Sequence, residues 1–228
     1  MPNALIIGAS RGIGRGLVEE FAKRGWSVVG TVRSDASAGD LKMLAKDSGG
    51  KVTLEQVDTT DAASGAALRD RLGDAQFDLI LVNAGVGGPQ SNPRTVTDAE
   101  FSALFITNAL GPVRLAEILA KSVKPQTGVV ALMTSQLGSI GGNTGGTELY
   151  RASKAALNSF TRSFAARHKD KGLTVLSLHP GWVRTDMGGP NAAIDVATSA
   201  RGLADVVERA QADRGDGFFD YAGKELPW

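Results

Sequence analysis

The chain has 228 residues, of which 42% are hydrophobic and 21% are charged, and these proportions are typical of a globular protein with a sizeable core. Its formal net charge of +1 gives no electrostatic reason to expect nucleic acid or an anionic membrane as a partner. The absence of cysteine excludes disulfide bonds and thiolate metal sites. His168 and His179 have no carboxylate nearby at ligand spacing, so no metal site is expected.

The expected elements follow from hydrophobic periodicity along the chain. Up to the middle of the chain they are a strand at 4–8, a helix from 13 to about 25, a strand at 27–32, a helix at 38–47, a strand at 52–57, a helix at 61–72 and a strand at 77–82. Then come helices at 97–107 and 109–121, a strand at 128–134, a helix at 149–169, a strand at 173–178, a helix at 195–212 and an edge strand at 217–221.

Alternating strands and helices with short connections predict an α/β protein, and apolar strands without alternation fit a parallel sheet that is covered on both faces. An eightfold (β/α) barrel is the rival architecture, but it typically needs ~250 residues and eight repeating units. We therefore predict a single Rossmann-type doubly wound, mainly parallel sheet of about seven strands with helices on both faces.

The connections between these elements indicate the number of domains, and the apolar segments indicate the cellular location. No composition break, proline-rich linker or internal repeat divides the chain, so residues 1–228 are expected to form one domain. No segment reaches the ~18 consecutive apolar residues of a membrane helix. The first ten residues lack the basic start and the long apolar stretch of a signal peptide, so a cytoplasmic location is expected.

The first strand runs directly into the glycine-rich turn "GASRGIG" at 8–14, which opens the first helix. Glycine permits a sharp turn and a close approach by a ligand, and the free N–H groups of a helix start attract an anion. Dinucleotide-binding folds use this arrangement for a pyrophosphate. The alternative is a turn without a ligand, but the position between the first strand and the first helix favours a nucleotide.

A tyrosine and a lysine stand four positions apart in a predicted helix, in the stretch "YRASK" at 150–154, and therefore share one helix face. An ammonium near a phenol favours the phenolate and lowers the pKa of the phenol, so Tyr150 and Lys154 can form a tuned proton donor. Taken alone, the pair is more simply explained by a surface tyrosine that lies over a lysine stem.

Together with "NAG" at 83–85 and "TS" at 134–135, these two motifs resemble the short-chain dehydrogenase/reductase family in type, order and spacing. The resemblance covers nearly the whole chain. The stretches "LHPGWVRTDMGG" and "GFFDYAGKELPW" are similar to the small carbonyl reductases grouped with the sniffer and C-factor proteins. Ile7 is a departure, because the family often has a threonine there that helps to hold the turn.

The resemblance implies a catalytic set. In this family the tyrosine exchanges the proton at the substrate oxygen, a role that falls on Tyr150, while Lys154 would lower the pKa of the tyrosine and hold the nicotinamide ribose. Ser135 would hydrogen-bond the carbonyl oxygen, with Ser139 in the following glycine-rich segment as a rival. Asn108 matches the asparagine that holds a water next to the lysine; a helix-kinking or capping role is the alternative.

The resemblance also implies a cofactor. An acid at the end of the second strand would select NAD(H), whereas a nearby arginine accommodates the 2′-phosphate of NADP(H). Val32 stands at the place of the acid, Arg33 follows it, and Arg11 is a second cation on the same side. These residues favour NADP(H) over NAD(H), although Asp35 is close enough in sequence to turn towards the ribose.

The other implied cofactor contacts follow the ends of the later strands. Asp58 would contact the adenine edge, and Val183 and Thr185 would bond the nicotinamide carboxamide. Trp182 is either a wall of the substrate pocket or plain packing. The predicted cofactor-binding set is Gly8, Ser10, Arg11, Gly12, Ile13, Gly14, Arg33, Asp58, Asn83, Ala84, Gly85, Tyr150, Lys154, Pro180, Gly181, Val183 and Thr185.

The sequence therefore predicts an NADP(H)-dependent oxidoreductase that transfers hydride between the nicotinamide and a small carbonyl or alcohol substrate. The short segment at 188–196 is expected to leave the pocket open. A cofactor-binding regulatory or signalling protein of the C-factor type, with little turnover, is the alternative. The helices at 109–121 and 149–169 carry more apolar residues than one buried face needs, so a homodimer or homotetramer is expected unless neighbouring helices of the same chain cover them.

Overall fold

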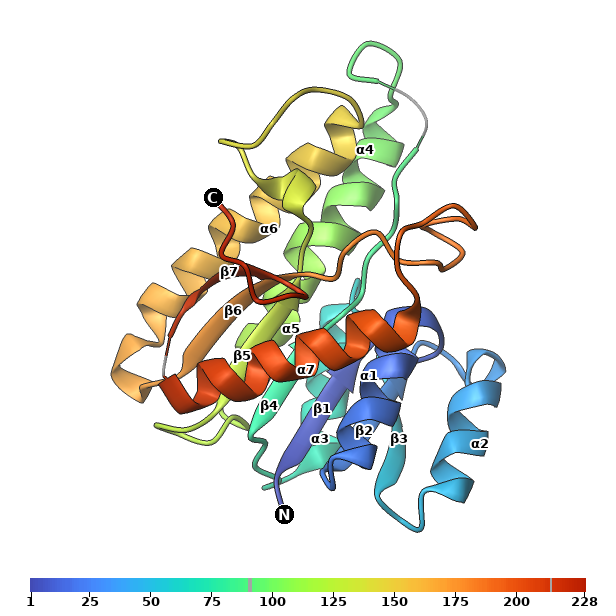
Figure 1. The fold of residues 1–228 in the computed structure, drawn as a ribbon, viewed down its shortest axis with the longest axis vertical. Coiled ribbons are helices and arrows are strands. Elements are labelled where there is room, and N and C mark those ends of the chain that lie inside the picture. The colour runs from blue at the N-terminus through green and yellow to red at the C-terminus, as the bar shows by residue number, and fades with distance from the viewer. Residues whose placement is uncertain (90–91, 214) are drawn as a thin grey trace.

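The computed structural model describes residues 1–89, 92–213 and 215–228, and at its centre lies a seven-stranded sheet (Figure 1). The strand order is β3-β2-β1-β4-β5-β6-β7, and each neighbouring pair is parallel. Because all seven strands point the same way, their carboxyl ends meet at one edge of the sheet. The strands are β1 (Asn3–Ile7), β2 (Ser27–Val32), β3 (Val52–Gln56), β4 (Leu79–Val82), β5 (Val129–Met133), β6 (Thr174–His179) and β7 (Gly217–Asp220).

Helices cover both faces of the sheet. One face carries α1 (Gly12–Lys23), α2 (Gly39–Asp47) and α7 (Val196–Asp213). The other carries α3 (Ala62–Leu72), α5 (Gly111–Leu119) and α6 (Glu148–Arg167), with α4 (Asp98–Phe105) leading into α5. Short 3-10 turns lie at Asp35–Ser37, Gln136–Gly138 and Lys169–Lys171.

The predicted doubly wound parallel sheet is confirmed, including β7 as its edge strand. One boundary differs in kind: the expected break between the helices at 97–107 and 109–121 is a π-helical turn, Ile106–Leu110, so the chain stays helical from α4 into α5. A π-helical turn inserts an extra residue into the helical repeat without ending it, and such turns occur often at functional sites.

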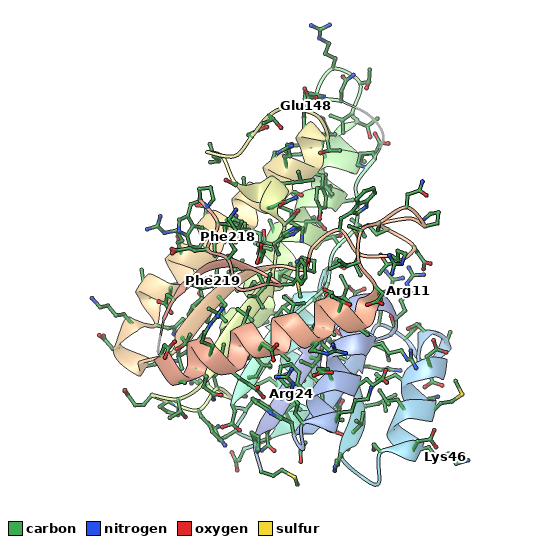
Figure 2. The ribbon with its side chains drawn as sticks, viewed as in Figure 1. Arg11, Arg24, Lys46, Glu148, Phe218 and Phe219 are labelled. Carbon is green, nitrogen blue, oxygen red and sulfur yellow. The ribbon has the colours of Figure 1, made fainter. Side chains whose placement is uncertain are left out.

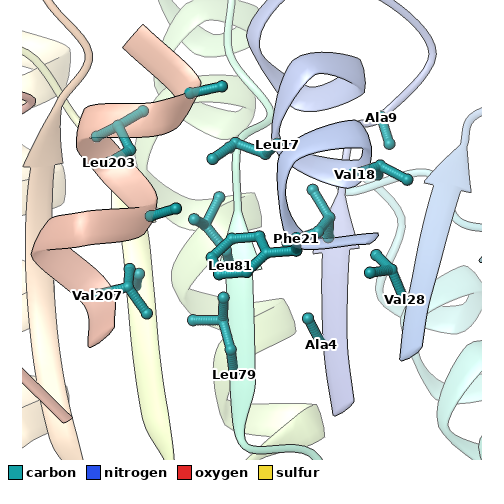
Figure 3. Close-up of a cluster of buried hydrophobic side chains, with 14 of the residues drawn as sticks. Ala4, Ala9, Leu17, Val18, Phe21, Val28, Leu79, Leu81, Leu203 and Val207 are labelled. Atoms are coloured by element: carbon teal, nitrogen blue, oxygen red, sulfur yellow. The ribbon is translucent and has the colours of Figure 1, made fainter. Parts of the chain in front are cut away.

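The core under α1 and α7 fixes where the first helix starts. Leu17 and Phe21 of α1 and Leu203 of α7 are fully buried and converge on Leu81 of β4 (Figure 3). At the far end of α1, Arg24 forms ion pairs that tie the helix to α7, at 2.7 Å to Asp205 and 2.6 Å to Glu208. Helix α1 is therefore held over the centre of the sheet, with its N-terminus at the carboxyl edge.

Among the described residues, one helical stretch, Asp98–Leu119, is long and apolar enough by composition to cross a membrane. Leu115, Ala116 and Leu119 in this stretch are buried in the core on the α5 and α6 side of the sheet. Packing in the core accounts for these three side chains, and half of the apolar stretch is buried.

Candidate active site

The glycine turn after β1 leaves no room for side chains. Gly8 has a φ of +82°, which favours glycine, and a Cβ at Gly8 would lie 3.3 Å from the backbone nitrogen of Ala84. A Cβ at Gly14 would collide with the carbonyl oxygen of Gly8 and lie 2.8 Å from Nδ2 of Asn83. That amide nitrogen donates to the same carbonyl at 3.1 Å. The turn is thus packed directly against the backbone that follows β4.

A threonine that the sequence analysis did not single out holds this turn from β2. The backbone N–H of Gly8 donates to Oγ1 of Thr31 at 3.1 Å, and Thr31 is fully buried. A hydroxyl from the neighbouring strand therefore anchors a turn that has Ile7 where the family often has threonine. The sequence signal for it was a polar residue near the carboxyl end of a mostly apolar predicted strand. Ser10 and Ile13 in the same turn are half-buried, and Ile13 packs on the core.

The start of α1 is open to an anion. Arg11 occupies the N-cap position, where no side chain caps the helix, and the first turn contains no acidic residue. Gly12 has a φ of +55°, and a Cβ there would lie 3.4 Å from the methyl group of Thr185. Arg11 itself pairs with Asp186 at 2.6 Å, with both side chains largely exposed (Figure 2). The loop after β6 thus reaches the glycine turn after β1.

The segments after β2 and β3 contain an arginine whose guanidinium is unpaired in the described ranges. Arg33 is exposed and makes no hydrogen bond or ion pair within the described ranges. Hydrogen bonds from the hydroxyl and the backbone N–H of Thr60 hold the pKa of Asp58 below its usual value, and the charge of Arg33 contributes in the same direction. Asp35, which might have turned towards a ribose, is paired with Lys42 at 2.7 Å.

Tyr150 and Ser135 meet at the carboxyl edge of the sheet. Tyr150 lies in the first turn of α6, and Ser135 lies two residues beyond the end of β5. The side chain of Ser135 is near enough to the phenol to act on the pKa of Tyr150. The backbone N–H of Leu137 donates to Oγ of Ser135 at 3.1 Å, which orients the serine at the start of the 3-10 turn.

Ser139, the rival to Ser135, has a different set of contacts. Its side chain is buried, and its hydroxyl accepts from the backbone N–H of Gly142 at 2.9 Å and donates to the carbonyl oxygen of Trp228 at 3.5 Å. These bonds close a loop and link it to the last residues of the chain. The geometry favours Ser135 as the partner of Tyr150.

Lys154 is buried behind the tyrosine. Its Nζ donates to the carbonyl oxygen of Met133 at 2.9 Å and lies 5.9 Å from the ring centroid of Tyr150. Burial lowers the pKa of Lys154 to about 8. A Cβ at Gly85 would lie 3.2 Å from this Nζ, so the backbone after β4 comes close to the ammonium because residue 85 has no side chain.

The expected lowering of the Tyr150 pKa is not found within the chain itself. Burial raises the pKa of Tyr150, and the hydrogen bond from Ser135 opposes that rise only in part. The physical reason is that loss of water disfavours the phenolate, while the ammonium of Lys154 is directed at the Met133 carbonyl. The sequence argument weighed the charge of the neighbour and left out the burial of the phenol.

Asn108 lies in the π-helical turn and is fully buried. Its Oδ1 accepts from the backbone N–H of Val86 at 2.8 Å, and its Nδ2 donates to the Val86 carbonyl at 2.8 Å and to Oγ of Ser153 at 3.1 Å. Ser153, inside the "YRASK" stretch, donates in turn to the carbonyl of Tyr150 at 2.7 Å. Asn108 therefore joins the loop after β4 to α6, the helix that carries Tyr150 and Lys154. Its position in the π-helical turn also fits the alternative that it bends the helix.

The loop after β6 completes the edge. The carbonyl of Pro180 accepts from the hydroxyl of Ser199 at 2.7 Å, and Gly181 has a φ of +85°. Val183 is buried and forms a bridge with Ile194. Trp182 is 57% exposed and its ring nitrogen donates to the Gly188 carbonyl at 2.9 Å, which excludes the interpretation of Trp182 as core packing.

His179 ends β6 without a catalytic partner. Burial lowers its pKa to about 4, so the imidazole is neutral near pH 7. Across the described ranges, no group of three or more histidine, aspartate or glutamate side chains is arranged to hold a metal ion.

Comparison with known proteins places this geometry in a family. Residues 2–194 match the family model for short chain dehydrogenases. A solved short-chain dehydrogenase/reductase from Burkholderia multivorans with bound NADP is 42% identical, with a TM-score of 0.91, and the match covers 100% of this chain and 99% of that one. The carbonyl reductase Sniffer of D. melanogaster is 31% identical with a TM-score of 0.90, over 100% of both chains.

A signalling protein is also among the relatives. The C-signal protein of Myxococcus xanthus is 40% identical over 153 residues, which are 66% of this chain and 92% of that protein. The family-model match, the similarity to these relatives and the arrangement of the Tyr150 and Lys154 helix beside the glycine turn agree with one another. The chain belongs to the short-chain dehydrogenase family.

Proposed function

We propose that this protein is an NADP(H)-dependent oxidoreductase that interconverts a small carbonyl compound and its alcohol, with Tyr150 as the general acid and base. The observation that carries the proposal is the convergence of Tyr150, Ser135 and Lys154 at the sheet edge where the open start of α1 also lies. The assignment of residues 1–228 to one oxidoreductase domain and the cytoplasmic location are parts of the same proposal.

The residues at this edge fit a nicotinamide dinucleotide. The turn around Gly8 and Gly14, which a Cβ would fill, provides a close backbone approach and free helix N–H groups for a pyrophosphate. Arg33, with Arg11 at the start of α1 as a second cation, suits a 2′-phosphate, since guanidinium groups bind phosphate through paired hydrogen bonds. Because Asp35 is paired with Lys42, its carboxylate is not directed at the ribose, where it would favour NAD(H). The bound NADP in the Burkholderia relative supports the choice of cofactor.

The remaining predicted contacts divide along the cofactor. Asp58 would meet the adenine edge, Asn83, Ala84 and Gly85 would line the middle, and Lys154 would hold the nicotinamide ribose. The turn at Pro180 and Gly181, with the backbone of Val183 and the hydroxyl of Thr185, would hold the carboxamide.

The chemistry of the chain's own residues follows from their charges. When bound, the cofactor supplies or accepts the hydride. Ser135 donates a hydrogen bond to the substrate oxygen as negative charge develops there. The raised pKa keeps Tyr150 protonated near pH 7, so it can donate its proton to that oxygen during reduction. Lys154, with a pKa of about 8, still carries its charge at pH 7 and stabilises the phenolate that forms.

Exposed apolar side chains follow two strands at this edge. Val86, after β4, is 43% exposed, and Trp182 and Met187, after β6, are 57% and 58% exposed. A Cβ at Gly87 would lie 3.7 Å from Cγ of Met187, so the two loops approach each other. Large exposed apolar groups near a polar site suit an apolar substrate body with one carbonyl or hydroxyl.

A regulatory role of the C-signal type is the second candidate. The 40% identity with the Myxococcus xanthus protein favours it, although that match spans only 66% of this chain. A regulator needs the cofactor turn but not the hydroxyl pair of Tyr150 and Ser135. Measurement of NADPH oxidation with a panel of aldehydes, ketones and quinones separates the two candidates, because a regulator would bind NADPH and show no turnover above background.

The substitution Tyr150→Phe removes only the proton donor. We expect kcat to fall by roughly 10²–10⁴-fold, the usual contribution of general acid catalysis. The dissociation constant of NADPH, measured by fluorescence, should stay within about twofold, a smaller change than the typical ~1 kcal/mol of one hydrogen bond. Tyr221→Phe is the matched control, since it removes the chain's other phenol and should leave kcat nearly unchanged. A Tyr150→Phe enzyme with more than about a tenth of the wild-type kcat would rule out Tyr150 as the acid.

The burial of Lys154 predicts a pH-dependent stability. Between pH 8 and 10.5 the unfolded lysine keeps a proton that the folded one has lost, so its contribution to the free energy of unfolding rises with pH in this window. The slope is at most about 1.4 kcal/mol per pH unit. Urea unfolding of wild type and Lys154→Met should therefore show a stability advantage of the variant that shrinks as pH rises. The exposed Lys46→Met serves as control, and parallel curves for wild type and Lys154→Met would contradict the prediction.

Arg33→Ala tests the choice between the two cofactors. The KM for NADPH should rise about tenfold or more, the effect of losing a charged hydrogen bond of roughly 1.5–3 kcal/mol, while the KM for NADH hardly changes. Asp35→Asn should leave the KM for NADH unchanged, because Lys42 holds that carboxylate. Equal effects of Arg33→Ala on both cofactors would show that Arg33 does not contact the 2′-phosphate.

The predicted homodimer or homotetramer depends on a smaller surface than the sequence suggested. Of the apolar residues on α5, Val113, Leu115, Ala116 and Leu119 are covered within the chain. What stays exposed is Phe160 on α6 at 40%, together with Phe101 at 42%, Ile106 at 37% and Leu110 at 38% along α4 and the π-helical turn. We expect light scattering at micromolar protein to give a multiple of 23.7 kDa. A single species at the mass of one chain would refute the oligomer.

A further inference from the structure

The chain after β7 folds back along that strand. Phe219 forms an antiparallel bridge with Glu225, and the backbone N–H of Leu226 donates to the Phe218 carbonyl at 2.7 Å. A tight turn supports the reversal, because the carboxylate of Asp220 accepts from two backbone N–H groups of that turn at 2.9 Å. The return segment, residues 225–228, therefore has a defined course, and it ends beside α6 and the segment that follows β5 (Figure 1).

Two side chains contact the ring of Trp228. Its ring centroid lies 5.5 Å from that of Phe218 on β7, and the guanidinium of Arg162 on α6 lies 5.2 Å from the indole. Phe218 is labelled next to Phe219 on β7 in Figure 2. An aromatic contact and a cation–π contact each add roughly 0.5–1.5 kcal/mol to the gain from burial, so the ring is an anchor for the segment.

The anchored residue holds a loop that belongs to the candidate active site. The backbone N–H of Gly141 donates to the carbonyl oxygen of Trp228 at 3.2 Å, and the hydroxyl of Ser139 approaches the same oxygen at 3.5 Å. Ser139 also accepts from the backbone N–H of Gly142 at 2.9 Å. These bonds bring residues 139–142, which lie between Ser135 and Tyr150, together with a segment about ninety positions later in the chain.

The loop needs an external anchor because its own sequence gives it little rigidity. Residues 140–148 are all exposed. Gly145 and Gly146 have φ values of +89° and +71°, and glycine loses more backbone entropy on ordering than any other residue. On its other side the loop is tied to α6, where Nδ2 of Asn158 donates to the Gly138 carbonyl at 3.3 Å.

We propose that the return segment, through Trp228, is a positioning element for the substrate side of the active site. By fixing Ser139 and Gly141, it holds the loop that connects Ser135 to Tyr150 and so sets the spacing of the two hydroxyl groups around the substrate oxygen. The segment makes no contact with the glycine turn after β1 in the described part of the chain, so it acts on the carbonyl substrate and not on the cofactor. This inference rests on the proposed function.

Trp228→Ala tests the anchor, with Glu225→Ala as a matched control in the same segment. The Glu225 side chain makes no hydrogen bond or ion pair among the described residues. We expect Trp228→Ala to speed amide hydrogen exchange at 138–142 and to lower kcat/KM for a carbonyl substrate by about tenfold, mainly through kcat, since small misplacements of reacting groups have effects of this size or larger. The dissociation constant of NADPH should be unchanged, and Glu225→Ala should behave as wild type in all three measurements.

A second variant keeps the test decisive if Trp228→Ala does not fold. Ser139→Ala removes the hydroxyl that joins Gly142 to Trp228 and leaves the indole in place, so it should give a smaller fall in kcat/KM. Unchanged exchange at 138–142 in both variants would overturn the anchor. Faster exchange with an unchanged kcat/KM would overturn its role in substrate positioning. A wild-type protein without turnover on any carbonyl would instead contradict the proposed function.

Discussion

The absence of a side chain at residue 14 is the constraint on which the candidate site depends. Helix α1 begins directly above the end of β1, and the Gly8 carbonyl occupies the space that a Cβ of Gly14 would need. Any larger residue would push α1 away from β4 and break the hydrogen bond from Asn83 to that carbonyl. Because α1 is also pinned by the core through Phe21, the misfit could not be relieved by a simple shift of the helix. The open helix start is therefore a consequence of packing as well as of glycine's flexibility.

A second constraint is the burial of two groups that titrate. A buried ammonium is costly unless hydrogen bonds replace water, and Lys154 has the Met133 carbonyl for that purpose. Burial moves the pKa of Lys154 down and that of Tyr150 up, so the chain alone keeps both groups protonated at pH 7. The protein thus provides a protonated phenol, Tyr150, as a proton donor and a nearby ammonium, Lys154, as a cation. A positive charge that arrives with a bound ligand would be needed to favour the phenolate further.

Much of the fold was predictable because its signals are local. Apolar runs and amphipathic periods placed all seven strands, and a parallel sheet necessarily brings their carboxyl ends together. That geometry explains why Gly8 and Ser135 could be assigned to one edge, whereas Tyr150, on a helix, was assigned to it through the family resemblance. The contacts that escaped prediction join residues whose partners are fixed only by register or by the fold as a whole. The bond from Gly8 to Thr31, the pairing of Asp35 with Lys42 and the contact of Ser139 with Trp228 are of this kind.

The cofactor side and the substrate side of the site are determined by different features. For this reason the sequence reveals the first more readily than the second. The glycine turn is specified by backbone conformation: a φ of +82° at Gly8 and the missing room at Gly14 restrict which residues are tolerated, and so they leave a recognisable motif. The substrate side is lined by exposed side chains on loops, such as Trp182 and Met187, and no packing requirement restricts their identity. The cofactor-binding turn is therefore encoded in a backbone conformation that few sequences can adopt. Substrate choice is encoded in surface residues that many sequences can vary without loss of the fold.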